Sequence, residues 1–119
     1  MLIVDDQPEI RRALRMVLKA SSQPCRILGA SEGESALALA RSERPDLVLL
    51  DIVLPGSGPS GVLVCQELCK DSRTKVVIVS AEASDSIVEA CLSLGAIEYI
   101  RKPFSVPDLQ EKLGVWLGG

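Results

Sequence analysis

The chain has no histidine among its 119 residues, and aromatic residues make up only 3% of it. The absence of histidine excludes histidine-based acid–base catalysis, serine–histidine triads and histidine-ligated zinc sites. It also means that the chain cannot serve as its own phosphohistidine donor. With so few aromatic rings, the core has to consist of aliphatic side chains, and the 47% hydrophobic content is enough to fill it.

Signals for membranes and secretion are also missing. No apolar run approaches the length of a membrane span, and the first residues do not resemble a signal peptide. The four cysteines form no C-x-x-C pair, and a metal site made by them is disfavoured because no other soft ligand is evident. We interpret Cys25, Cys65, Cys69 and Cys91 as reduced, buried or half-buried thiols, and we expect a cytoplasmic protein with no membrane partner.

The charge balance is mildly acidic, with a net charge of −3 at pH 7. This argues against a basic face for nucleic acid in this segment and is compatible with an acidic metal site. The length suits one domain with one core. Because there is no internal repeat and no linker-like boundary, residues 1–119 are interpreted as a single domain.

Short apolar runs alternate with amphipathic stretches along the chain. Five runs are expected to be strands: residues 1–4, 25–29, 47–50, 76–79 and 97–100. Five helices are expected between and after them, beginning at Pro8, after Ser31, at Val62, at Ser84 or Asp85, and at Ser105. This alternation predicts an α/β fold, a parallel sheet with helices on both faces.

Local signals predict where several helices begin and end. Pro8 suits the first position of a helix, and Ser31 with Glu34 matches a capping box. Pro45 is expected to end the second helix, and Gly95 the fourth. In the first helix, the arginines at 11, 12 and 15 are interpreted as a solvated face or a partner surface.

Polar residues follow four of the expected strands. Asp5 and Asp6 follow the first, Asp51 the third, Ser80 the fourth and Lys102 the fifth. The carboxyl edge of an open α/β sheet is where ligands bind. Three carboxylates there repel each other, and a hard cation relieves that repulsion. A hydroxyl and an ammonium beside them suit a phosphate, so the pattern predicts a Mg²⁺ and phosphoryl site.

Each of these residues also has an ordinary explanation when taken alone. Asp5 and Asp6 match helix N-caps, and Asp51 and Ser80 match residues that end strands or form turns. Lys102 matches a solvated surface lysine. The glycine-rich stretch 56–61 lacks the Gly-Lys-Ser/Thr ending of a phosphate-binding loop and is interpreted as an ordinary flexible loop.

Taken in order, the motifs resemble the response-regulator receiver domain of two-component signalling, of the chemotaxis-regulator-like kind. The matching stretches are residues 2–6, 45–51 with Pro55, 79–81, 95–99 and 102–104. The resemblance covers essentially the whole chain. It implies a flavodoxin-like, doubly wound (βα)5 fold with a five-stranded parallel sheet of order 2-1-3-4-5.

The resemblance also implies a site chemistry. Asp51 would accept a phosphoryl group from a histidine kinase or a histidine phosphotransfer protein. Asp5 and Asp6 would bind Mg²⁺ together with Asp51 and the backbone carbonyl of Val53. The chain would be a signalling domain rather than an enzyme, limited to Mg²⁺-dependent self-phosphorylation and slow autodephosphorylation.

Further residues have implied roles in binding the phosphoryl group and in switching. Ser80 and Lys102 would bind the phosphoryl oxygens, and the Lys102–Pro103 peptide bond would be cis. Tyr99 would be an aromatic residue that changes rotamer with phosphorylation. The switched surface would comprise the fourth helix, the fifth strand and the fifth helix, within residues 84–112.

Two alternatives remain open from the sequence. A Mg²⁺-dependent aspartate-nucleophile phosphatase of the haloacid-dehalogenase type would carry a second Asp where Val53 stands. A pseudo-receiver that is never phosphorylated would lack part of the acidic pocket. The resemblance also suggests two further interactions. One is with an effector domain beyond residue 119, and the other is with a second copy of the chain in a phosphorylation-dependent homodimer.

The loop after Asp51 departs from the family pattern. It runs about two residues longer than usual over residues 55–61, and it lacks the Asp that usually precedes the third helix.

Overall fold

The computed structural model describes residues 1–20, 26–56, 58–81 and 84–118. Strands and helices alternate along these residues, as predicted. In chain order they are β1 (Leu2–Val4), α1 (Pro8–Lys19), β2 (Leu28–Ala30), α2 (Gly33–Glu43), β3 (Leu47–Leu50), α3 (Gly61–Leu68), β4 (Lys75–Ser80), α4 (Asp85–Leu94), β5 (Glu98–Arg101) and α5 (Val106–Gly118).

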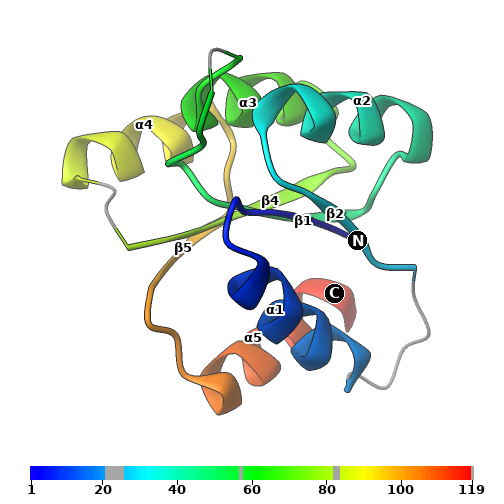
Figure 1. Cartoon of the computed structure of the whole chain (residues 1–119). Helices are drawn as coiled ribbons and strands as arrows, with labels where there is room; N and C mark the ends of the chain where they lie inside the picture. The colour runs from blue at the N-terminus through cyan, green and yellow to red at the C-terminus, as the bar shows by residue number, and fades with distance from the viewer. Residues whose placement is uncertain (21–25, 57, 82–83, 119) are drawn as a thin grey trace.

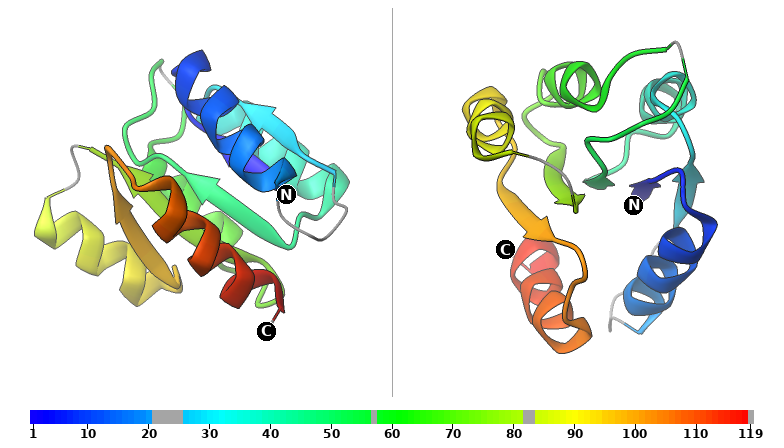
Figure 2. Two further views of the ribbon diagram at one scale, coloured as in Figure 1. Left: turned by 90° about the horizontal axis from the view of Figure 1, so that it is seen from below. Right: turned by 60° about the vertical axis from the view of Figure 1, so that its left-hand side comes forward.

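The strands form one parallel sheet in the order β2-β1-β3-β4-β5, which confirms the predicted topology. Helices α2, α3 and α4 cover one face, and α1 and α5 cover the other (Figures 1 and 2). In the register of the sheet, Val4 lies beside Leu50, and Leu50 lies beside Ile78. The carboxyl ends of β1, β3 and β4 therefore meet along one edge.

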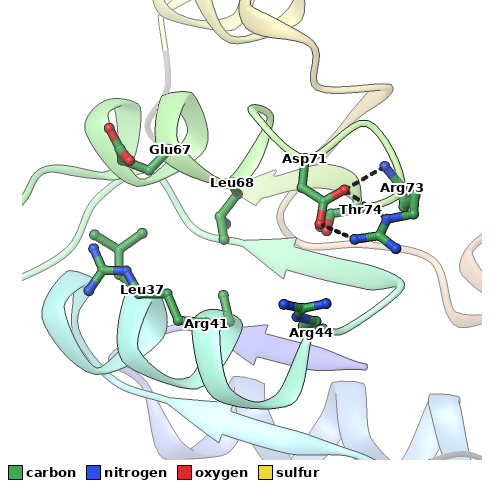
Figure 3. A pocket seen from close by; sticks show the side chains of 9 residues that line it. Leu37, Arg41, Arg44, Glu67, Leu68, Asp71, Arg73 and Thr74 are labelled. Carbon is green, nitrogen blue, oxygen red and sulfur yellow. Dashed lines mark hydrogen bonds and ion pairs between the residues drawn. The ribbon is translucent and has the colours of Figure 1, made fainter.

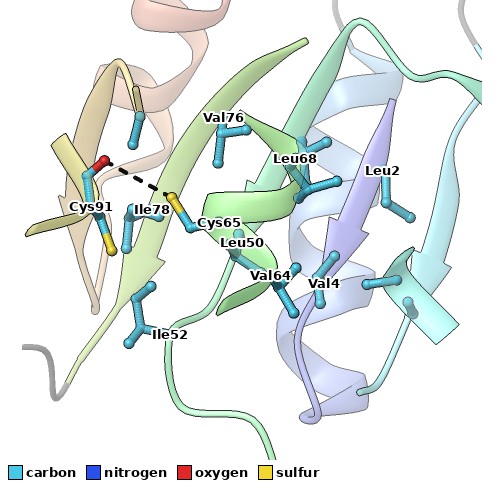
Figure 4. Close-up of a cluster of buried hydrophobic side chains, with 14 residues drawn as sticks. Leu2, Val4, Leu50, Ile52, Val64, Cys65, Leu68, Val76, Ile78 and Cys91 are labelled. Atoms are coloured by element: carbon cyan, nitrogen blue, oxygen red, sulfur yellow. Dashed lines mark hydrogen bonds between the residues drawn. The ribbon is translucent and has the colours of Figure 1, made fainter. Parts of the chain in front are cut away.

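The core consists of two apolar clusters, one on each face of the sheet. In β3, Val48 and Leu50 belong to the cluster under α2, α3 and α4, which Figure 4 shows. Leu47 and Leu49 belong to the cluster under α1 and α5. The unbroken apolar run of β3 is therefore buried on both faces, as expected of a central parallel strand.

Strand β2 differs from its predicted bounds. It covers Leu28–Ala30, whereas the sequence suggested residues 25–29. Each of its three residues pairs with one residue of β1, so β2 is as short as the neighbour with which it pairs. Cys25, at the predicted start, lies outside the described residues.

The predicted capping box of Ser31 and Glu34 is wrong. Helix α2 begins at Gly33, its N-cap residue is Glu32, and no side chain caps it. A Cβ atom on Gly33 would lie 2.5 Å from the carbonyl oxygen of Pro59. At its start, α2 therefore packs against Pro59 of a distant loop and has no side-chain cap.

The longer loop after Asp51 packs closely where it ends. Ser60 caps α3 by accepting a hydrogen bond from the backbone N–H of Leu63, 3.3 Å away. A Cβ atom on Gly61 would lie 2.2 Å from the carbonyl oxygen of Ile52. Glycine is thus required where the chain passes back over the segment that follows β3. Ser57, within this loop, lies outside the described residues.

The expectation of a solvated arginine face on α1 is wrong for two of its three residues. Arg12 is exposed, but Arg11 and Arg15 are half-buried. Arg11 donates a hydrogen bond to the carbonyl oxygen of Asp5 and Arg15 to that of Ile27. Sequence periodicity places a residue on a helix face but does not reveal a backbone acceptor in a neighbouring loop.

Three cysteines lie between α3 and α4, in agreement with the interpretation as reduced core thiols. Cys65 and Cys91 are buried and Cys69 is half-buried, and all three are free. The Sγ atoms of Cys65 and Cys69 are 3.9 Å apart. Burial raises the pKa of all three thiols, that of Cys65 most clearly. No helix within the described residues is long and apolar enough to cross a bilayer.

Candidate functional site

The carboxyl edge of the sheet brings together residues from four strands. Asp5, Asp51 and Ser80 are polar yet only 1%, 6% and 1% exposed. Backbone hydrogen bonds continue the sheet past the strand ends and fix two of these positions. The N–H of Asp51 donates to Val4 over 2.9 Å, and the N–H of Asp5 donates to Ala30 over 3.0 Å.

Lys102 connects the two buried carboxylates. Its Nζ lies 2.5 Å from Oδ2 of Asp5 and 3.0 Å from Oδ2 of Asp51. The Lys102 backbone N–H donates to the carbonyl oxygen of Ser80 over 3.1 Å, which places this side chain beside the end of β4. The Lys102–Pro103 peptide bond is cis, as the resemblance implied.

The other oxygen of each carboxylate also accepts hydrogen bonds. Oδ1 of Asp51 accepts hydrogen bonds from the Ser80 hydroxyl and from the backbone N–H of Val53, both over 2.9 Å. Oδ1 of Asp5 accepts from the backbone N–H of Gln7, also over 2.9 Å. Both carboxylates are therefore oriented by the protein itself.

Asp6 completes an acidic cluster with the two buried aspartates. Asp5, Asp6 and Asp51 each offer a carboxylate oxygen, and these oxygens lie within 4.8 Å of one another. Asp6 is exposed, whereas the other two are buried. Three carboxylates face one ammonium, so negative charge remains in excess, and all the ligand atoms are oxygens. This donor set fits a hard divalent cation such as Mg²⁺.

Burial and charge pairing shift two pKa values in the site. Burial raises the pKa of Asp5, although hydrogen bonds from Lys102 and Gln7 act in the opposite direction. Burial by itself would lower the pKa of Lys102, but its hydrogen bonds to Asp5 and Asp51 outweigh this and raise it. The metal-free site thus keeps a cationic lysine beside a carboxylate whose ionised form is costly.

A cavity of about 220 Å³ opens beside this cluster. Its lining residues are Asp6, Gln7, Asp51, Val53, Ser80, Ala81 and Lys102. Of these, Gln7 and Ala81 were not predicted to belong to the site. Gln7 directly follows Asp6, and Ala81 directly follows Ser80. Their positions next to predicted site residues could have indicated that they line the site. The cavity offers an anion the ammonium of Lys102 and the hydroxyl of Ser80.

A larger cavity of about 430 Å³ lies between α2 and α3, away from this cluster (Figure 3). Both carboxylates in its lining already have basic partners. Asp71 pairs with Arg73, and Glu67 pairs with Lys70 over 2.8 Å. None of the acidic cluster lines it, so its greater size does not make it the chemical site.

Tyr99 lies on β5, next to β4, and is half-buried against the cluster under α2, α3 and α4. Its hydroxyl donates a hydrogen bond to the carbonyl oxygen of Ser80. The guanidinium carbon of Arg101 lies 5.7 Å from the centre of its ring. The structure therefore brings Tyr99 into contact with the backbone of the site.

A family model and individual sequence relatives both match this chain to response regulators. The family described as "Response regulator receiver domain" matches residues 1–114. The DNA-binding response regulator MtrA of Mycolicibacterium smegmatis is 38% identical over 108 residues, covering 91% of this chain and 46% of that protein. The probable transcriptional regulator ycf27 of Guillardia theta is 40% identical over 114 residues, covering 94% and 42%. The chain thus spans less than half the length of these relatives.

Solved structures show the same fold. The receiver domain of NtrX from Brucella abortus superposes with a TM-score of 0.86 at 29% identity, covering 98% of this chain and 97% of that one. The Mn²⁺-bound form of the response regulator Rcp1 has a TM-score of 0.82 at 26% identity, covering 98% and 92%. With this fold, this order of strands and a family match over nearly its whole length, the chain belongs to the response regulator receiver domains.

Proposed function

We propose that this chain is a single receiver domain over residues 1–119 that accepts a phosphoryl group on Asp51. The observation that carries the proposal is the pairing of Asp51 with both Lys102 and Ser80 at the mouth of a small polar cavity. A carboxylate is already a nucleophile when ionised, so no general base is needed. The lack of histidine in the chain is therefore no obstacle to this chemistry.

In the proposed reaction, a carboxylate oxygen of Asp51 attacks phosphorus, and the bond from phosphorus to the donor's leaving atom breaks. The attacking oxygen has to be in line with that leaving atom. Negative charge on the transferred group would be balanced by the ammonium of Lys102, and the Ser80 hydroxyl would donate to a phosphoryl oxygen. The expected donor is a phosphohistidine, on a histidine kinase or a phosphotransfer protein.

We also propose that Mg²⁺ is the cofactor, held by Asp5, Asp6, Asp51 and the carbonyl of Val53. When bound, a divalent cation neutralises charge on phosphoryl oxygens. The proximity of three carboxylates supports this proposal. The Mn²⁺-bound form of the similar protein Rcp1 shows that a divalent metal binds to a protein of this fold.

Phosphorylation would be transmitted through Ser80 and Tyr99. The added group brings about −1.5 to −2 charge and new acceptor oxygens. Ser80 would turn from Asp51 to the phosphoryl group, and Tyr99, bonded to the Ser80 carbonyl, would change rotamer. We expect the surface of α4, β5 and α5 to change as a result, and to serve effector contact or homodimer formation.

The proposed setting is the cytoplasm, with an effector domain as a further partner. This is supported by the relatives, which are more than twice as long as the match and are described as DNA-binding or transcriptional regulators. The domain itself has an acidic charge balance, so nucleic acid is not proposed as its own ligand. A phosphatase of the haloacid-dehalogenase type is disfavoured because Val53 occupies the place of that family's acid–base Asp.

The proposal is tested with acetyl phosphate as a small donor. Intact mass should rise by one phosphoryl group in the presence of Mg²⁺, and hydroxylamine should remove that group. EDTA should prevent the reaction. An adduct that persists in Asp51→Ala would contradict the assignment, and rapid multiple turnovers on a general phosphate ester would favour the phosphatase instead.

A further inference from the structure

The carbonyl oxygen of Asp5 accepts a hydrogen bond from the guanidinium of Arg11, with 2.7 Å between Nη1 and the oxygen. This carbonyl belongs to the planar peptide group that joins Asp5 to Asp6. The hydrogen bond therefore constrains the orientation of the peptide group that leads into Asp6. On the other side of Asp5, its N–H is bonded to Ala30, so Arg11 completes the support of this turn.

Asp6 depends on its backbone more than the other two carboxylates do. Asp5 and Asp51 are buried, and their carboxylates accept hydrogen bonds from protein donors. Asp6 is exposed, and among the described residues no hydrogen bond or ion pair to its carboxylate is found. The direction of its side chain is therefore determined mainly by the orientation of the peptide group before it.

Arg11 is itself held in place. It is half-buried, and its aliphatic stem passes over Gly29 of β2, where a Cβ atom would lie 3.6 Å from Arg11 Cδ. Arg12, the next residue, carries the same charge but is exposed.

We propose that Arg11 is a positioning residue for the metal site. It holds the Asp5–Asp6 peptide group so that the Asp6 carboxylate faces the cation. The inference rests on the proposed function, because it takes Asp6 to be a Mg²⁺ ligand. A simple charge effect would have the opposite sign: removing a positive charge close to a cation site strengthens cation binding, whereas loss of positioning weakens it.

The test is a Mg²⁺ titration of the full chain followed by amide NMR. Arg11→Met should bind Mg²⁺ about 10-fold more weakly than the wild type, as found when groups that orient metal ligands are removed. Arg12→Met removes the same charge one residue away and is the matched control. It should bind as tightly as the wild type or slightly more tightly.

Two further measurements separate positioning from a general loss of structure. Arg11→Lys keeps the charge and a donor, so it should recover part of the lost affinity and remain folded. Without metal, the amide nitrogen of Asp6 should shift in Arg11→Met, because its own peptide group loses a hydrogen bond. The Asp6 amide should not shift in Arg12→Met.

The outcomes are distinguishable. If the wild type binds Mg²⁺ and Arg11→Met binds it equally or more tightly, the positioning role is overturned while the proposed function stands. If the wild type itself shows no Mg²⁺ binding, the proposed metal site fails, and the positioning role fails with it.

Discussion

The hydroxyl group of Tyr99 donates a hydrogen bond to the backbone carbonyl oxygen of Ser80, over 3.1 Å. The side chain of the same serine donates to Asp51, over 2.9 Å. A single residue thus lies between the candidate phosphoacceptor and the candidate switch. Any change in the Ser80 side chain that follows phosphorylation has a short path to Tyr99, because both contacts belong to one residue.

Ser80→Ala should still be phosphorylated on Asp51, because the carboxylate and its acidic neighbours remain. It should lose most of the response at Tyr99 and α4, because the hydroxyl that would follow the phosphoryl group is gone. Coupling between two sites is typically worth about 1–3 kcal/mol, so the loss should be partial to large. Amide shifts of wild type and variant, each with and without beryllofluoride, measure it. Equal changes around Tyr99 in both proteins would place the switch elsewhere.

Asp5→Asn should stabilise the metal-free protein at pH 7 by about 1 kcal/mol, within the range of single stabilising substitutions. Burial raises the pKa of Asp5 above its ordinary value of 3.8. A group with a raised folded pKa contributes stability below its unfolded pKa and loses that contribution as the pH rises through the folded pKa. Ionised Asp5 therefore costs stability at neutral pH, and a neutral amide removes that cost.

The pH dependence provides the check on this prediction. Unfolding by urea in EDTA should show the gain at pH 7 and a smaller gain as the pH falls toward 4, where the wild-type carboxyl becomes neutral. Asp6→Asn, at an exposed position, is the control and should change stability by no more than about 0.5 kcal/mol. A lower stability of Asp5→Asn at pH 7 would mean that its bond to Lys102 outweighs the cost of burial.

Gly61→Ala should destabilise the fold by about 2 kcal/mol or more, because overpacking against backbone cannot be relieved by a rotamer change. A Cβ atom there would lie 2.2 Å from the Ile52 carbonyl oxygen. Gly114→Ala is the matched control, since nothing lies within 4 Å of its added Cβ atom. In the interior of α5 it should stabilise by roughly 1 kcal/mol. Denaturant midpoints measure the stability of both variants. If both substitutions changed stability in the same direction, the close packing at Gly61 would be contradicted.

Cys65 and Cys91 should react slowly with a thiol reagent at pH 8, and Cys69 faster. The thiolate is the reactive form, and burial raises the pKa of all three thiols. Cys69 is the one of the three that is only half-buried. Mass mapping of alkylated peptides over time gives the order, with the denatured protein as the control in which all react. Equal rates in the native state would contradict the burial.

The sequence predicted the fold class and, through the family resemblance, the order of the strands, and it singled out four residues that the structure brings together at one edge of the sheet. The strand β3 and the helix start at Pro8 follow from unbroken apolar character and from proline chemistry, both of which are local. The meeting of Asp5, Asp51, Ser80 and Lys102 follows from the rule that parallel strands end at one edge. Their roles in binding and phosphoryl transfer remain predictions.

Other features could not be read from local patterns. Ser31 and Glu34 have the spacing of a capping box, yet α2 begins at Gly33, beside Pro59 of a distant loop. Arg11 is half-buried and donates a hydrogen bond to the carbonyl oxygen of Asp5, a contact that the spacing of residues along α1 does not reveal. Such contacts join segments that are remote or irregular, and periodicity carries no information about them.

The alternation of core residues has a consequence for insertions and deletions. Ile3 and Leu49 belong to the apolar cluster under α1 and α5, whereas Val4 and Leu50 belong to the cluster under α2, α3 and α4. Adding or removing one residue within β1 or β3 would turn the following aspartate to the opposite face of the sheet. Exchange of one aliphatic side chain for another leaves that aspartate in place. In these strands, the number of residues is therefore more constrained than their identity.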